Sequence, residues 1–176
     1  MAGAGMKDIK RRIKSVESTM QITKAMELVS SSKLRRAKEK VEKSRPYFNI
    51  LQETIQKVLD NTKSLKSVYT KEREIKNSLF IVIAGDRGLA GGYNANIIKA
   101  AVAEMEGKNP KIIPIGRKAS EYFGKRNYEV VEDYVNVAES LDFIDAALIT
   151  SVADEMYRNG KVDEVYVCYT EFVSAL

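Results

Sequence analysis

The residues best placed to perform chemistry form a glycine-rich segment at positions 85–94. The segment follows a run of six apolar residues and precedes a helical pattern, the position where nucleotide-binding folds hold phosphates on backbone N–H groups. However, its glycines are spaced G-x-x-G-x-x-G, and the chain contains no Gly-Lys-Ser/Thr sequence for a P-loop. We therefore predict a structural glycine turn, with dinucleotide binding as the alternative. Its glycines are Gly85, Gly88, Gly91 and Gly92.

The residues after the second predicted strand do not suit the binding of a nucleotide. An acidic residue that could bind a ribose hydroxyl is missing where this strand ends, because Gly116 is followed by Arg117 and Lys118. These two cations could contact a 2′-phosphate, but exposed cations after a strand also form solvated turns. We expect the solvated turn.

The chain is poor in the residue types that most enzymes use. It contains no histidine, and Cys168 is its single cysteine, which removes the usual zinc sites and histidine-based catalysis. The carboxylates of Glu129, Glu132 and Asp133 could form an acidic site, but their spacing favours the solvated face of an edge strand. We therefore predict no catalytic, cofactor-binding or metal-binding residue on this chain.

Positive charge is concentrated in the first third of the chain. Residues 1–60 hold 14 Lys or Arg against 7 Asp or Glu, a balance of +7, whereas residues 61–176 hold 15 against 17, a balance of −2. Such asymmetry predicts an acidic partner surface. No apolar run is long enough for a membrane span, and the N-terminus lacks the pattern of a signal or transit peptide. These features predict a bacterial cytoplasmic protein.

Residues 6–59 predict one very long helix, because they contain no glycine and only one proline, Pro46. At 1.5 Å per residue this helix would be roughly 80 Å long. Pro46 cannot donate to the carbonyl of Glu42, so a kink is expected there. Apolar residues spaced by four and three predict a coiled-coil seam, which contains Ile9, Ile13, Val16, Met20, Leu34, Ala37, Val41, Phe48, Leu51, Ile55 and Val58.

The seam is interrupted between residues 23 and 30. There the apolar residues are Ile22, Met26 and Val29, each one position earlier than the seam requires. One residue corresponds to about 100° around a helix, so the apolar face rotates locally. This shifted stripe is either an irregularity of packing or a segment that faces a different partner.

Beyond residue 60, the polar, lysine-rich residues 61–77 predict a connector, and residues 78–176 predict an α/β domain. Strands and helices alternate there, which favours a small Rossmann-like, mainly parallel, doubly wound sheet. Asn94 and Ser140 are the expected N-caps of two helices, and Gly160 is the expected end of the second. The predicted strands cover 79–84, 111–115, 128–134 and 165–169, and the helices 95–106, 117–126 and 141–159.

Three separated segments closely resemble the gamma subunit of bacterial F-type ATP synthases. They are residues 21–35 with 44–47, residues 6–13, and residues 86–94, which read QITKAMELVSSSKLR with SRPY, MKDIKRRI, and DRGLAGGYN. The resemblance spans nearly the whole chain, so it is more specific than a single short motif. It implies a rotor whose N-terminal helix turns inside a ring of alpha and beta subunits while the α/β domain rests on the membrane c ring.

The resemblance also implies roles for residues and partners. The chain itself would be non-catalytic, would bind alpha, beta and epsilon subunits and the c ring, and would bind no nucleic acid. It would lie at the cytoplasmic face of the bacterial plasma membrane as a peripheral protein without a span. The residues expected to contact the alpha–beta ring are Ile22, Lys24, Met26, Val29, Lys33, Arg35 and Arg36.

One feature departs from the family pattern. Family members carry a long C-terminal helix after the α/β domain, and this sequence ends at Leu176, so we expect a partial chain that lacks the helix on which the seam would pack.

Two alternative functions remain open from the residues alone. One is a nucleotide-binding α/β enzyme with a coiled-coil arm, and the other is a nucleic-acid-binding protein that uses the basic helix.

Overall fold

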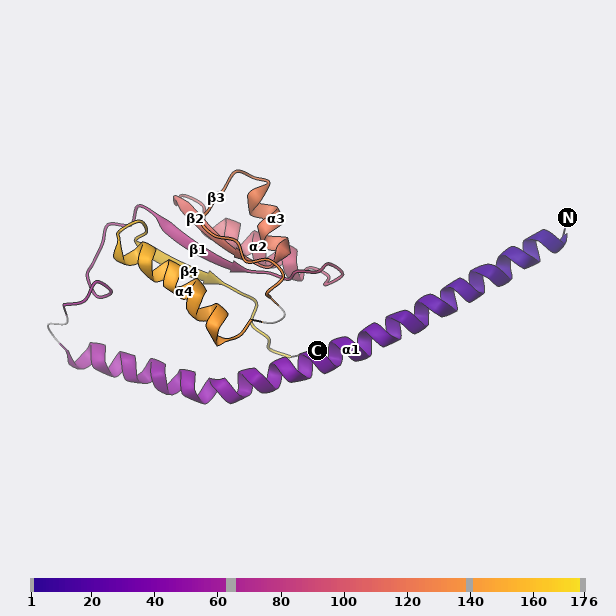
Figure 1. The fold of residues 1–176 in the computed structure, drawn as a ribbon, viewed down its shortest axis with the longest axis horizontal. Helices are drawn as coiled ribbons and strands as arrows, with labels where there is room; N and C mark the ends of the chain where they lie inside the picture. Colours follow the sequence, from indigo (N-terminus) through magenta and orange to yellow (C-terminus); the bar gives the residue numbers. More distant parts are fainter. Residues whose placement is uncertain (1, 63–65, 139–140, 175–176) are drawn as a thin grey trace. The chain divides into compact units, whose positions relative to one another are not determined.

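The computed structural model describes residues 2–62, 66–138 and 141–174, with residues 2–4 described by their backbone alone. The chain divides into two compact units, Met1–Leu65 and Lys66–Leu176. The first contains the helix α1, and the second contains a parallel sheet with its helices (Figure 1). Each unit is described below by itself.

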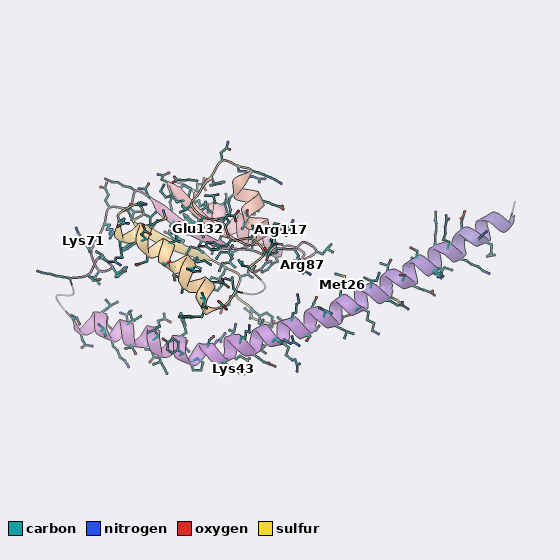
Figure 2. All side chains as sticks on the ribbon, viewed as in Figure 1. Met26, Lys43, Lys71, Arg87, Arg117 and Glu132 are labelled. Carbon is teal, nitrogen blue, oxygen red and sulfur yellow. The ribbon has the colours of Figure 1, made fainter. Side chains whose placement is uncertain are left out.

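Helix α1 spans Ala2–Asn61 and continues through Pro46 without a break. Its 60 residues correspond to a length of about 90 Å, so the helix predicted over residues 6–59 is confirmed and slightly longer. The helix bends near Lys43, which is labelled in Figure 2. A bend here is expected because Pro46 has no N–H for the carbonyl of Glu42 and its ring crowds that carbonyl.

The sheet of the second unit has four parallel strands, in the order β3-β2-β1-β4. The strands are β1 (Ser78–Ile83), β2 (Pro110–Ile115), β3 (Glu129–Val130) and β4 (Glu164–Cys168). In the register, Leu79 of β1 lies between Lys111 of β2 and Val165 of β4. The strand order reverses at β1, which confirms the predicted doubly wound α/β fold.

Helices cover both faces of this sheet. Helices α2 (Tyr93–Glu104) and α3 (Arg117–Gly124) pack on the face that contains Phe80, whereas α4 (Phe143–Arg158) packs on the face that contains Leu79. Phe80 and Leu79 are both fully buried, since neighbouring residues of a central strand point to opposite faces. This explains why the apolar run of β1 is continuous instead of alternating.

Two predicted helix caps are wrong. Helix α2 starts after Gly92, and the side chain of Asn94 points back to the glycine turn instead of capping the helix. Helix α4 is capped by Asp142, whose carboxylate accepts from the N–H groups of Ile144 and Asp145 in a capping box. The predicted cap Ser140 lies outside the described residues. Gly160, at φ +69°, closes α4 as expected.

The edge strand is also shorter than predicted. Strand β3 pairs with β2 only over Glu129 and Val130, and a single isolated bridge joins Tyr134 to Ile115 further on. Residues 128–134 were predicted as a polar edge strand, but Pro114 of β2 has no N–H to continue the ladder on this side. The remaining helix and strand boundaries of the α/β domain agree with the predictions to within two residues.

Candidate interaction surface

The apolar seam of α1 is exposed along its whole length. Its large apolar side chains, from Ile9 to Val58, are between 42% and 67% exposed. Within the described part of α1, all side chains from Gly5 onward are exposed except that of Ser32, which is half-buried. An apolar stripe of this size is expected to be covered by another helix or protein surface.

Thr23, which interrupts the seam, and the nearby Thr19 bind their hydroxyl groups within the helix. Thr23 donates its hydroxyl to the carbonyl of Thr19 at 2.9 Å, and Thr19 donates to Ser15 at 3.0 Å. These threonines therefore satisfy their polar atoms inside the helix. They need no polar partner from outside.

The helix places most of the predicted contact residues on one face. Ile22, Met26, Val29, Lys33 and Arg36 are spaced by four, three, four and three, so they line one stripe of an uninterrupted α-helix. Met26 is labelled on α1 in Figure 2.

The other two predicted contact residues lie elsewhere. At about 100° per residue, Lys24 and Arg35 fall roughly 200° and 220° around the helix from Ile22, so they occupy the opposite side of α1. The structure thus brings five of the seven predicted residues together and separates two. All seven side chains are exposed.

Two polar side chains, those of Asn94 and Asp86, make the hydrogen bonds that hold the glycine turn after β1. Asn94 accepts from the N–H of Gly85 at 2.7 Å and donates to the carbonyl of Arg87 at 3.1 Å. Asp86 accepts from the N–H groups of Arg117 at 2.9 Å, Asn136 at 2.7 Å and Ala138 at 3.2 Å. These bonds tie the turn to the start of α3 and to the loop after β3.

The glycines of this region serve different geometric needs. Gly91 has φ +54°, and a Cβ on Gly85 would lie 3.1 Å from the amide oxygen of Asn94. A Cβ on Gly92 would lie 2.9 Å from the amide of Asn96, whereas Gly88 has open space around it. Outside the motif, a Cβ on Gly116 would lie only 2.1 Å from the carbonyl oxygen of Ala84, so β1 and the start of α3 approach closely.

Sequence reasoning did not find the role of Asp86. Its position in the sequence could have indicated this role, because an aspartate just after a buried strand of a parallel sheet lies beside the N–H groups of neighbouring loops. Arg117 and Lys118 follow β2 as predicted. The side chain of Arg117 donates to Asn136 and that of Lys118 lies 3.6 Å from Glu121.

The acidic residues near β3 are engaged in local contacts. Glu129 pairs with Lys111, and Asp133 accepts from the hydroxyl of Ser120 at 2.6 Å. Burial, followed by the hydrogen bond to Glu132, raises the pKa of Tyr134. In residues 2–62, 66–138 and 141–174, no group of three His, Cys, Asp or Glu side chains is placed to hold a metal ion.

Cys168 lies half-buried at the end of β4. Burial, with a smaller contribution from the charge of Glu104, raises the pKa of its thiol. A raised pKa keeps the thiol protonated and weakly nucleophilic at neutral pH.

None of the helices in the parts of the chain that the structure describes combines the length and apolar character that a membrane crossing requires.

These features define a class of protein: a long helix with an exposed apolar seam, joined to a small parallel α/β domain. The family described as ATP synthase matches residues 5–176. The chain belongs to the gamma chain family of ATP synthases, a family of subunits of an enzyme complex.

Similar proteins carry the same description. An ATP synthase gamma chain of Alkaliphilus metalliredigens is 50% identical over 175 residues, which cover 99% of this chain and 61% of the relative. That of Ruminococcus albus is 46% identical over 98% of this chain and 62% of the relative. A gamma chain described as sodium ion specific, from Acetobacterium woodii, is 41% identical over 97% of this chain and 57% of the relative. The chain thus spans about three fifths of the length of these relatives.

Proposed function

We propose that this chain belongs to the central stalk of an F-type ATP synthase and works as a rotor. Residues 1–60 form the shaft, residues 61–77 the connection and residues 78–176 the foot domain. The shaft turns inside the ring of alpha and beta subunits, and the foot contacts the epsilon subunit and the c ring at the cytoplasmic face of the bacterial plasma membrane. Rotation couples ion flow through the c ring to ATP synthesis or hydrolysis on the beta subunits.

The observation that carries this proposal is the exposed surface of α1. An uninterrupted helix of 60 residues presents one long apolar seam, and Ile22, Met26 and Val29 present a second stripe about 100° away. Two faces allow two kinds of neighbour, a partner helix on the seam and the ring on the second stripe. Apolar contacts such as those of Met26 can slide without the breaking of a fixed bond.

The foot domain supports a non-catalytic role. Asn94 binds backbone groups of the glycine turn, where a nucleotide-binding fold would bind phosphate. The carboxylate of Asp86, in the same turn, accepts from the N–H groups of Arg117 and Asn136. This arrangement argues for the structural turn over dinucleotide binding. The positive balance of residues 1–60 suits acidic surfaces of the ring.

Assembly tests the proposal directly. The complete gamma chain that contains this sequence is co-expressed with alpha and beta subunits, and ATP hydrolysis is measured with and without it. We expect a stable complex whose ATPase activity depends on the gamma chain. Failure to associate with the alpha and beta subunits would refute the proposal.

A single substitution tests the second stripe. Met26→Lys introduces a charge at the proposed contact, whereas Met26→Leu keeps an apolar side chain of similar size. We expect Met26→Lys to reduce ATP-driven ion pumping and Met26→Leu to preserve it. Equal pumping in both variants would remove Met26 from the contact surface.

A further inference from the structure

The residues immediately before β1 are bound to the α/β domain instead of forming a free connector. Residues 67–77, called here the anchor segment, include Tyr69, whose ring stacks on that of Tyr157 in α4. The two ring centroids lie 5.8 Å apart and the planes are 7° from parallel. The hydroxyl of Tyr69 also donates to Asp154, and this hydrogen bond is the main cause that raises the pKa of Tyr69.

Arg73 adds a second attachment at the end of α4. Its guanidinium carbon lies 4.0 Å from the centre of the Tyr157 ring, and its Nη1 donates to the carbonyl oxygen of Tyr157 at 2.7 Å. A cation favours both the face of an aromatic ring and the carbonyl groups that end a helix. Arg73 is half-buried, so water competes less for these contacts than at a fully exposed site.

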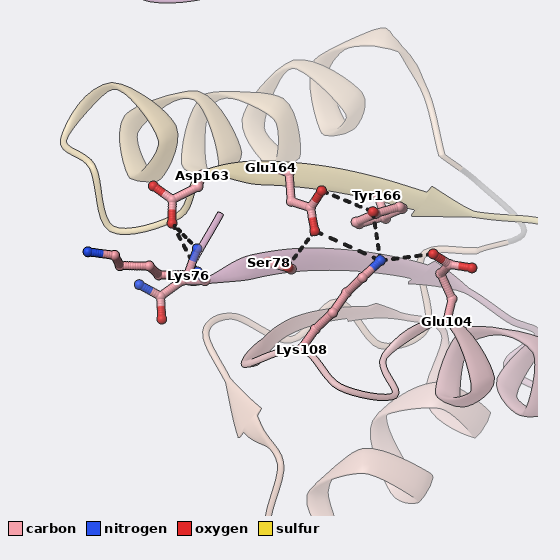
Figure 3. Close-up of polar contacts among 8 residues, drawn as sticks. Lys76, Ser78, Glu104, Lys108, Asp163, Glu164 and Tyr166 are labelled. Carbon is pink, nitrogen blue, oxygen red and sulfur yellow. Dashed lines mark hydrogen bonds and ion pairs between the residues drawn. The ribbon is translucent and has the colours of Figure 1, made fainter. Parts of the chain in front are cut away.

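Asp163 provides a third attachment, shown in Figure 3. One oxygen of its carboxylate accepts from the backbone N–H groups of Lys76 and Asn77, both at 2.9 Å, and its own N–H donates to the carbonyl of Asn77 at 2.8 Å. The N–H of Asn77, followed by that of Lys76, lowers the pKa of Asp163. The carboxylate is therefore charged, and bound at full strength, at neutral pH.

The next residues continue this connection into the sheet. Ser78 donates its hydroxyl to Glu164 at 2.6 Å, and Glu164 lies 3.9 Å from Lys108 (Figure 3). Lys108 also donates to Tyr166 at 2.7 Å and to Glu104 at 2.9 Å, and these hydrogen bonds raise its pKa. The anchor segment thus leads into a network that joins β1, β4 and the end of α2.

These attachments shorten the stretch of chain that separates α1 from the domain. If all of residues 62–77 were free, an extended chain could span about 60 Å between Asn61 and Ser78. The first residue of the segment that binds the rest of the domain is Tyr69, so only residues 62–68 remain between α1 and this attachment. Those residues span at most about 28 Å.

We propose that residues 67–77 form an anchor that limits the rotation of the α/β domain relative to α1. Tyr69, Arg73 and Asp163 are its positioning residues. This inference rests on the rotor function proposed above and assigns a role to a segment whose composition predicts only a connector. A long flexible tether would give the domain more freedom to turn relative to the helix, whereas a short, anchored one limits that freedom.

The test uses the membrane-bound complex assembled with the complete gamma chain. The double variant Tyr69→Ala/Arg73→Ala removes the attachments to Tyr157, and Lys71→Ala is the matched control. Lys71 is an exposed residue of the same segment, labelled in Figure 2. The readout is the number of ions pumped per ATP hydrolysed. We expect the double variant to hydrolyse ATP with a loss of pumping, and Lys71→Ala to pump as the wild type does.

A second variant separates anchoring from folding. An insertion of six Gly and Ser residues between Lys66 and Ser67 lengthens the tether but removes none of the contacts described above. We expect the same loss of pumping per ATP. If the wild-type complex is coupled and both the insertion and the double variant pump normally, the anchor inference is wrong. If the wild-type chain forms no coupled complex, the rotor proposal itself fails.

Discussion

Helix α1 and the α/β domain use the same apolar residue types in opposite ways. Phe48 of α1 is 61% exposed, whereas Phe80 of β1 is fully buried between α2 and the sheet. The domain packs its apolar side chains against one another, whereas α1 leaves its apolar side chains exposed in this structure. The difference teaches that the domain buries a core of its own, while the seam of α1 is left available for the neighbours that the proposed function requires.

The largest expected effect concerns the domain alone. Gly116→Ala would place a Cβ 2.1 Å from the carbonyl oxygen of Ala84 at φ +92°, and we expect a cost above about 4 kcal/mol because both backbones must move. Hydrogen exchange measured by mass spectrometry should show loss of protection in the sheet and unchanged protection in α1. Gly107→Ala is the control, since its φ is also positive but its Cβ meets open space. We expect it to cost about 1 kcal/mol.

If Gly116→Ala also reduced the hydrogen-exchange protection of α1, the stability of α1 would depend on the domain, and the two regions would not be independent.

A matched pair of phenylalanines sharpens the comparison. We expect Phe80→Ala to lower the free energy of unfolding by about 3–5 kcal/mol, because it leaves a cavity in the core. Phe48→Ala should change it by less than about 0.5 kcal/mol in this chain, because the ring is exposed. Urea denaturation of both variants measures the difference. Similar losses in the two variants would contradict it.

A smaller effect is expected at the glycine turn. Asp86→Ala removes the acceptor of three backbone N–H groups, and we expect a loss of about 1–3 kcal/mol. Thermal unfolding checks this value, with the exposed Glu106→Ala as control. A stable Asp86→Ala variant would show that the loops after β1, β2 and β3 need no common carboxylate.

The smallest effect is a pH dependence at the anchor segment. Because the pKa of Asp163 is lowered from its ordinary value of 3.8, its stabilising contribution is complete above about pH 4 and is lost as the pH falls through the lower pKa of the folded state. Thermal unfolding of the wild type and of Asp163→Asn between pH 6 and pH 2 checks this. The difference between the two proteins should shrink below pH 4. A constant difference would exclude the carboxylate as its cause.

Local patterns predicted most of the elements. The absence of glycine over 6–59 indicated α1, and the continuous apolar run at 79–84 indicated a strand buried on both faces. Both signals are local, since helix periodicity and strand burial are written in neighbouring residues. The edge strand was overestimated because residues 128–134 do not reveal which strand they pair with, and Pro114 of that strand lacks an N–H.

The candidate site was predictable only in part. Spacing identified the shifted stripe of Ile22, Met26 and Val29, and helix geometry alone places Lys24 on the other side of α1. The partners of Asp86 could not be read from the sequence, because they lie 31 to 52 residues away in other loops.

The anchor segment shows the same limit more clearly. By sequence alone, residues 61–77 are polar and lysine-rich, and their composition determines no more than a connector. Only the tertiary structure decides that Arg73 and Tyr69 meet Tyr157, more than 80 residues later, and that Asp163 holds Lys76 and Asn77. The sequence determined the long helix, the buried strands and the excess of positive charge, because these depend on neighbouring residues. The attachment of the connector depends on the strand order, which brings the end of α4 and the start of β4 beside β1.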